Sequence, residues 1–335
     1  MQTVIAGRET TATERIAARR HLLDLDDWRP DELLAVMTRA EAMLRVCQRA
    51  DKLETLRGQV LVNLFYENST RTRVSFELAG RRLGADITNV NASASSVAKG
   101  ESLIDTAKTL QALGTGIFVI RSGQSGAADL LARHVSGTVI NAGDGWHAHP
   151  SQALLDLFTL RRHLGNLAGR RVVIVGDILH SRVARSNVWS LTAMGAQVVL
   201  CGPPTLLPAA ARALYAERPV PGIELTRCVT VESCLERALA GADAVMVLRL
   251  QRERQQAGLL PSLREYTARW GLTPERLRLA RPGAPVLHPG PMNEGVEIDA
   301  AVAHGAASVI EEQVSNGVAV RMAVLDLLAG KEARA

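Results

Sequence analysis

The chain has 335 residues, 47% of them hydrophobic and 22% charged, which is the balance of a folded globular protein with room for two domains. Its formal net charge is +5, but basic and acidic residues are interspersed and only 3% of the residues are aromatic, so a nucleic-acid-binding surface is disfavoured. The sequence lacks an apolar run of about 18 residues, and its start lacks the pattern of a signal peptide, so we expect a cytoplasmic protein without membrane contact.

Apolar periodicity predicts alternating strands and helices along the first half of the chain. Residues 1–20 have little pattern, so we expect a loose arm there. Residues 91–100 are small and polar, which is typical of a loop. The other elements expected here are helices at 30–49, 72–83, 102–113 and 126–134, strands at 60–65, 85–90 and 116–120, and a strand from 139 that the glycine-rich residues 141–145 cut short.

The second half shows the same alternation after an apolar helix at 151–164, which is long enough to bridge two domains. A last helix at 307–328 has the length and apolar spacing to pack back on the first half. The remaining elements expected are strands at 171–177, 197–201, 244–250 and 284–288, and helices at 186–194, 207–217 and 231–239.

Strands that alternate with helices predict parallel sheets with helices on both faces. The expected fold class is therefore α/β, with two doubly wound parallel-sheet domains of similar size joined by helices. We place these domains at residues 1–150 and 151–306. Ligands of such folds bind beyond the carboxyl ends of the strands.

Residues 65–77 read Phe-Tyr-Glu-Asn-Ser-Thr-Arg-Thr-Arg-Val-Ser-Phe-Glu and form a polar turn between a predicted strand and a predicted helix. Ser69 and Thr70 are typical helix N-cap residues, and the free N–H groups of a helix start attract a phosphate. Arg71 adds a planar guanidinium that can hold a phosphoryl group through two parallel hydrogen bonds. An ordinary capped surface helix with solvated arginines is the alternative that the residues leave open.

Other basic side chains also follow predicted strands. Arg121 and His149 do so in the first half, so the fold can bring them close to Arg71. In the second half, Arg182 follows the strand expected at 171–177, and Arg249 lies at the end of the strand expected at 244–250. Taken alone, arginines in such places are mostly solvated or salt-bridged, and a histidine at a helix start is mostly structural.

Several other kinds of site are disfavoured. The sequence contains neither G-x-G-x-x-G nor G-x-x-x-x-G-K-[ST], which argues against a nucleotide-binding module of dehydrogenase type. The cysteines show no C-x-x-C spacing and no nearby histidine array, so we expect free thiols and no zinc site. They are Cys47, Cys201, Cys228 and Cys234.

Six motifs, taken in order, resemble those of the aspartate and ornithine carbamoyltransferase family over about residues 60 to 325. The resemblance implies a carbamoyl-phosphate-binding domain at 1–150, on which residues 307–335 pack back, and an aspartate-binding domain at 151–306. The motifs are Ser-Thr-Arg-Thr-Arg at 69–73, Ser-x-x-x-Lys-Gly-Glu at 95–101, His-Pro-x-Gln at 149–152, Val-Gly-Asp at 175–177 followed by Arg182, Arg-x-Gln-x-Glu-Arg at 249–254 and His-Pro-Gly-Pro at 288–291.

The family motifs also imply roles for single residues. Arg71, Lys99, Arg121 and His149 are expected to be catalytic. Carbamoyl phosphate is expected to bind to Ser69, Thr70, Arg71, Thr72, Ser95, Arg121, His149, Gln152, Gly290 and Pro291. Aspartate is expected to bind to Lys99, Arg182, Arg249 and Gln251. Glu294 replaces an arginine that many relatives carry, which puts any ion pair of that arginine in doubt.

The resemblance implies the transfer of a carbamoyl group from carbamoyl phosphate to L-aspartate, an early committed step of pyrimidine synthesis, without a metal or organic cofactor. The ornithine motifs His-Cys-Leu-Pro and Ser-Met-Gly are missing, which favours aspartate. A homotrimer is implied, in which Ser95 and Lys99 reach the neighbouring subunit's site, and regulatory or dihydroorotase-like chains are possible further partners. The alternatives are a carbamoyltransferase for another amine and a non-catalytic scaffold.

Overall fold

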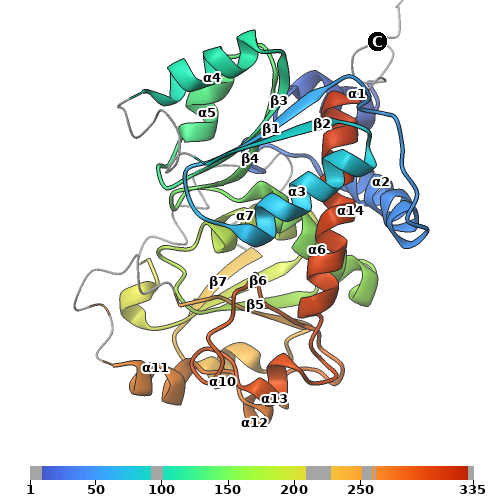
Figure 1. The fold of residues 1–335 in the computed structure, drawn as a ribbon. Helices are drawn as coiled ribbons and strands as arrows, with labels where there is room; N and C mark the ends of the chain where they lie inside the picture. Colours follow the sequence, from blue (N-terminus) through green and yellow to red (C-terminus); the bar gives the residue numbers. More distant parts are fainter. Residues whose placement is uncertain (1–9, 92–100, 209–227, 251–258, 260–261, 331–335) are drawn as a thin grey trace, which may run out of the picture.

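The computed structural model describes residues 10–91, 101–208, 228–250, 259 and 262–330 (Figure 1). Its strands are β1 (Val60–Phe65), β2 (Asp86–Asn91), β3 (Thr115–Ser122), β4 (Thr138–Asp144), β5 (Arg171–Val175), β6 (Gln197–Cys201), β7 (Val229–Glu232), β8 (Ala244–Val247) and β9 (Val286–Leu287). They form two parallel sheets, one in each lobe, with the orders β2-β1-β3-β4 and β7-β6-β5-β8-β9. The expected α/β class with two parallel-sheet domains is therefore confirmed.

Helices cover both faces of the first sheet. On one face lies α3 (Thr70–Arg82), which shares an apolar cluster with α2 (Pro30–Gln48), and on the other lie α4 (Leu103–Ala112) and α5 (Ala127–Ala132). Side chains alternate between faces along a strand, so Phe118 of β3 packs with α4 and α5 while Val119 packs toward α2 and α3. This double burial explains why β3 is an almost continuous apolar run.

The second sheet is covered in the same way. Val172 of β5 faces α6 (Pro150–Leu164) and α7 (Arg182–Ala193), whereas Val173 faces the opposite cluster. That cluster is built on short helices, and the sequence predicted only the first of them in part. They are α10 (Leu235–Leu239), α11 (Leu263–Trp270), α12 (Pro274–Leu277) and α13 (Ala300–Ala303).

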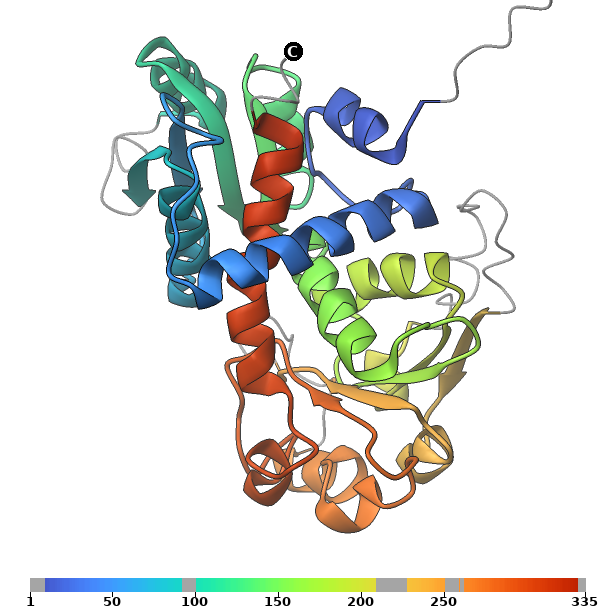
Figure 2. The same ribbon diagram turned by 90° about the vertical axis from the view of Figure 1, so that its right-hand side faces the viewer.

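The last helix, α14 (Ile310–Ala329), joins the two lobes. It rises from the second lobe into the first and crosses α2 (Figure 2). It packs against α2, α3 and α6, and most of its residues are buried. A helix that is apolar nearly all round belongs in a core, and α14 accordingly lies at the centre of the molecule.

The loose arm expected for residues 1–20 is wrong for its second half. Residues from Ala12 to Arg19 form α1, whose capping box pairs Thr11 with Glu14. Ile16 is fully buried, because α1 packs on α14 and α2. One buried side chain in eight residues leaves no apolar period to read.

One strand expectation and one helix expectation are also corrected. β4 continues through the polar and glycine-rich stretch to Asp144, because Asn141 pairs with Ile120 of β3 and its N–H donates to the carbonyl of Leu22. The expected helix at 231–239 divides into the edge strand β7 and α10, since the β-branched run at 229–231 pairs with β6.

The expected helix at 207–217 falls mostly outside the described residues, as does the expected loop at 91–100. Within the described part of the chain, no helix has the length and apolar character needed to span a membrane.

Candidate active site

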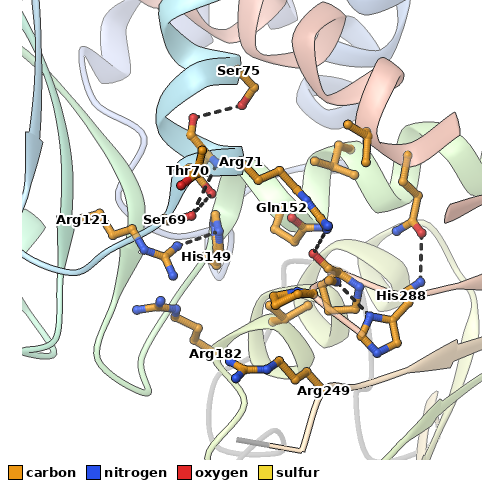
Figure 3. A pocket seen from close by; sticks show the side chains of 18 of the residues that line it. Ser69, Thr70, Arg71, Ser75, Arg121, His149, Gln152, Arg182, Arg249 and His288 are labelled. Carbon is orange, nitrogen blue, oxygen red and sulfur yellow. Dashed lines mark hydrogen bonds between the residues drawn. The ribbon is translucent and has the colours of Figure 1, made fainter. Parts of the chain in front are cut away.

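A cavity of about 490 Å³ opens where the carboxyl ends of the two sheets face each other (Figure 3). Its walls come from the ends of β1, β3, β4, β5, β8 and β9 and from α14. The described residues that line it are Glu67, Asn68, Ser69, Thr70, Arg71, Thr72, Ser75, Arg121, His149, Gln152, Leu155, Ser181, Arg182, Val183, Leu248, Arg249, His288, Pro289, Gly290, Pro291, Gln313, Val314 and Arg321.

The polar turn after β1 forms the start of α3. Ser69 is the N-cap: its side chain accepts a hydrogen bond from the N–H of Thr72 at 3.4 Å. Thr70 is the first helical residue, so α3 begins two residues earlier than expected. The first-turn N–H groups and the positive end of the helix dipole are thus directed into the cavity, as an anion site requires.

Arg71 crosses from the first lobe to the second. Its Nη1 donates to the carbonyl of Pro289, 2.8 Å away, in the loop that follows β9. The guanidinium lies against Gly290, where a Cβ atom would overlap it. Partial burial of Arg71 lowers its pKa through desolvation, but a guanidinium remains charged at neutral pH.

Arg121 and His149 come together at the ends of β3 and β4. Arg121 Nη1 donates to the carbonyl of Ala142 at 3.1 Å and lies 3.5 Å from His149 Nε2 (Figure 3). His149 occupies the N-cap position of α6, and its backbone N–H donates to the Ser186 hydroxyl of α7 at 2.9 Å. The two side chains are therefore held on the same wall of the cavity.

Arg182 is nearly buried, with 3% of its surface exposed. The N-cap Ser181 starts α7 at Arg182, four residues earlier than expected. Arg182 Nη2 donates to Glu67 Oε2 at 2.7 Å, and its Nη1 contacts the carbonyls of Ser122 and Gly145. Glu67 also lies 3.6 Å from Arg121 Nε, so one carboxylate connects arginines of both lobes.

Gln152 lies in the first turn of α6 and turns its amide nitrogen to Asp156, 2.9 Å away. Asp156 is fully buried, and burial raises its pKa to about 6 although three amides donate to it. One of these amides is that of Gln313, whose oxygen accepts from the N–H of His288 at 2.9 Å. His288 in turn accepts at Nδ1 from the N–H of Gly290.

Arg321 enters the cavity from the middle of α14. It is 3% exposed, donates to the carbonyl of Gly317 and stacks over the ring of Phe76. Desolvation lowers its pKa to about 10, and the neighbouring charge of Asp156 opposes that shift. The cavity therefore contains five guanidinium groups, and Glu67 is the one carboxylate among its described lining residues.

The structure brings most of the expected site residues into this one cavity. Three of them, Ser95, Lys99 and Gln251, lie outside the described residues. Glu294 is not a lining residue; it is exposed and contacts His304 at 3.1 Å. The expected site residues that line the cavity are Ser69, Thr70, Arg71, Thr72, Arg121, His149, Gln152, Arg182, Arg249, Gly290 and Pro291.

Sequence reasoning assigned no role to several polar groups at the site. Glu67 belongs to the polar turn at 65–77, and the signal that could have identified it is a carboxylate just after a strand. Arg321 is a charged residue inside an apolar helix, and a charged side chain that is buried in this way indicates a functional role. Among the described residues, no group of three or more His, Cys, Asp or Glu side chains is placed to hold a metal ion.

Comparison with known proteins gives consistent results over most of the chain. Residues 20–162 match the family model of the aspartate/ornithine carbamoyltransferase carbamoyl-P binding domain, and residues 168–328 match that of the Asp/Orn binding domain. An aspartate carbamoyltransferase catalytic subunit of Roseiflexus castenholzii is 56% identical over 316 residues, which cover 93% of this chain and 96% of the relative. That of Chloroflexus aggregans is 56% identical over 319 residues, covering 95% and 100%.

Solved structures show the same likeness. Aspartate transcarbamoylase from Trypanosoma cruzi, in complex with N-(phosphonacetyl)-L-aspartic acid, superposes with a TM-score of 0.81 at 28% identity and covers 91% of this chain and 94% of its own. Ornithine carbamoyltransferase from Pyrococcus furiosus superposes with a TM-score of 0.82 at 27% identity, covering 92% and 96%. The chain belongs to the aspartate/ornithine carbamoyltransferase family.

Proposed function

We propose that this chain is an aspartate carbamoyltransferase, which converts carbamoyl phosphate and L-aspartate into N-carbamoyl-L-aspartate and phosphate. The observation that carries the proposal is the interlobe cavity with five arginines around a helix N-terminus. The two substrates together carry a phosphate and two carboxylates, so a cavity of this charge fits both at once.

Carbamoyl phosphate occupies the wall built by the first lobe. Its phosphate accepts hydrogen bonds from the first-turn N–H groups of α3 and from Arg71. Arg121 and His149 lie beside the carbonyl oxygen, and the amide of Gln152 faces the amino group. Family resemblance supports these roles together with that of Ser95.

Aspartate occupies the wall built by the second lobe. Arg182 and Arg249 come from the ends of β5 and β8, and each can bind one carboxylate. The cationic side chain of ornithine would face an arginine in the same place, which is unfavourable. The resemblance adds Lys99 and Gln251 to this half of the site.

The reaction is a direct acyl transfer. The amino group of aspartate attacks the carbamoyl carbon, a new C–N bond forms, and the bond from that carbon to the phosphate oxygen breaks. Negative charge grows on the carbonyl oxygen and on the leaving phosphate, where Arg71, Arg121 and His149 stabilise it. The phosphate takes the proton that the amine loses, and holding both substrates in one cavity supplies much of the acceleration.

The assembly we propose is a cyclic homotrimer in which each site receives Ser95 and Lys99 from a neighbour. Val74 and Leu78 support self-association near the site, since they lie one turn apart on α3 and remain 41% and 45% exposed in the single chain. Regulatory or dihydroorotase-like chains are further candidates as partners. The reaction belongs to pyrimidine biosynthesis, and we place it in the cytoplasm.

A substrate panel tests the proposed function. The purified chain, given carbamoyl phosphate, should form the carbamoyl derivative of L-aspartate, and its turnover of L-ornithine should be negligible. Comparable rates on the two amino acids would show that Arg182 and Arg249 do not select a carboxylate. Preference for a third amine would identify a carbamoyltransferase of other specificity, and absence of any product would favour a non-catalytic scaffold.

A further inference from the structure

Asp156 is a buried carboxylate at the junction of three helices, and the chemistry described above does not use it. It is fully buried on α6 and accepts hydrogen bonds from three amide groups. Gln152 Nε2 and Gln313 Nε2 lie 2.9 and 2.7 Å from Oδ1, and Asn187 Nδ2 lies 2.9 Å from Oδ2. These donors belong to α6, α14 and α7, so one side chain meets all three helices.

An ionised carboxylate can only accept hydrogen bonds, and this fact fixes the orientation of each amide around it. Gln152 must point its nitrogen at Asp156, which leaves its oxygen for the cavity. No described residue donates a hydrogen bond to that oxygen. A free acceptor at this point is complementary to the amino group of a carbamoyl ligand, which can only donate in its planar, conjugated form.

Gln313 is fixed from both of its ends. Its nitrogen donates to Asp156, and its oxygen accepts from the N–H of His288 at 2.9 Å, a group that can only donate. The loop after β9 is thereby held in place, and its Pro289 carbonyl accepts from Arg71 at 2.8 Å. Three hydrogen bonds and the backbone from His288 to Pro289 thus connect Asp156 with the phosphate-binding arginine.

We propose that Asp156 is a positioning residue: by fixing the amides of Gln152 and Gln313, it turns one oxygen toward the carbamoyl group and locks the loop that supports Arg71. The proposal rests on the proposed function, because it assumes a carbamoyl ligand. It adds a selectivity device to that function. Asp156 lets the site recognise the amino group of carbamoyl phosphate as well as its phosphate.

Acetyl phosphate is the probe for this device, since it differs from carbamoyl phosphate by a methyl group in place of the amino group. We expect the unaltered chain to bind carbamoyl phosphate about threefold to tenfold more tightly, the difference that one neutral hydrogen bond makes. Asp156→Ala should bring the ratio of the two dissociation constants, measured by calorimetry, close to one. A general loss of protein stability would weaken the binding of both ligands alike and leave this ratio unchanged.

Asn187→Ala is the matched control. It removes the third donor to the same carboxylate by an equal truncation, but its side chain is not among the residues that line the cavity. The ratio should stay at the unaltered value in this variant. An unchanged ratio in Asp156→Ala, or an equal loss in both variants, would overturn the proposal.

A pH titration of the unaltered chain decides the matter if Asp156→Ala does not fold. Burial raises the pKa of Asp156 to about 6, and Arg321 of α14 is the charged group that faces it, with Arg71 beyond. Protonation gives the carboxyl an O–H donor that competes with the amides. The preference for carbamoyl phosphate over acetyl phosphate should therefore fall as the pH drops below about 6. Both ligands carry an acyl phosphate group that binds in the same place, so a ratio that does not change with pH would overturn the proposal.

The proposed function can fail independently of this inference. A chain that binds neither acyl phosphate, or that forms no carbamoyl aspartate, would refute the function. If the unaltered chain is fully active but Asp156→Ala and Asn187→Ala have the same ratio of dissociation constants, only the role of Asp156 is refuted.

Discussion

Gly290 leaves the room that the guanidinium of Arg71 needs. Its φ is +65°, and a Cβ atom would overlap Arg71. We expect Gly290→Ala to displace Arg71 and to raise the KM for carbamoyl phosphate at least about tenfold, since losing a charge-assisted contact typically costs roughly 2–5 kcal/mol. Steady-state kinetics at saturating aspartate measures the effect.

Gly283 supplies the control for that change. Its φ is +78°, but a Cβ atom there meets nothing within 4 Å. Gly283→Ala therefore carries a similar backbone cost without a clash. If both variants shift the KM equally, backbone strain causes the change and the space beside Arg71 does not matter.

The sequence was sufficient to find residues that face the cavity but not their partners. Motifs located Arg71 and His149, and the end of a predicted strand located Arg121; all three line the cavity. The bonds from Glu67 to Arg182 and from Asp156 to Gln313 join residues 115 and 157 positions apart. Local patterns carry no information about such pairs, since they depend on how distant elements pack.

At the scale of elements, α1 shows what a short helix contributes. Ile16 is fully buried between α1 and the helices α2 and α14. We expect Ile16→Ala to lower the free energy of unfolding by roughly 2–5 kcal/mol, the usual cost of such a cavity. Because α1 does not line the active-site cavity, kcat should stay unchanged.

Urea unfolding at fixed protein concentration measures this loss. Leu113→Ala serves as the comparison, since Leu113 is 75% exposed and its truncation should cost less than about 0.5 kcal/mol. Equal effects of the two substitutions would mean that α1 is not packed in solution as described.

The elements that the sequence predicted well are those whose burial repeats along the chain. Helices α2 and α14 and strands β1 and β3 bury a regular set of side chains, and their bounds lie within about three residues of expectation. β4 and β7 were misjudged because their pairing partners, rather than their own apolar pattern, keep them extended. Short helices such as α12 and α13 are similarly held by the cluster they cover.

At the scale of the molecule, the site exists only where both lobes meet. Arg71 of the first lobe donates to Pro289 of the second, and Glu67 of the first pairs with Arg182 of the second. The sequence predicted each sheet separately, because the apolar periodicity of an element reports its burial within one domain and not its contacts with the other. The relative placement of the lobes is set by α6 and α14, which no local pattern could orient.

The proposed trimer leads to a test by mixing subunits. Arg71→Ala and Lys99→Ala chains should each be nearly inactive. If Lys99 serves the neighbouring site, random reassembly of equal amounts pairs an intact Arg71 with an intact Lys99 in about a quarter of the sites, as follows from a head-to-tail ring. Carbamoyl aspartate formation should rise from near zero toward about a quarter of the unaltered rate.

The reverse mixture makes the test specific. When unaltered chains are reassembled with chains that carry both substitutions, a site shared between neighbours is intact in about a quarter of cases, whereas a site within one chain stays intact in about half. Shared sites therefore predict equal activity for the two mixtures, because in each about a quarter of the sites pair an intact Arg71 with an intact Lys99. Sites within one chain predict near zero for the first mixture and about half for the second. Native mass spectrometry must show that hybrid trimers have formed. If such trimers are present and the first mixture stays inactive, Lys99 acts on its own chain or on none.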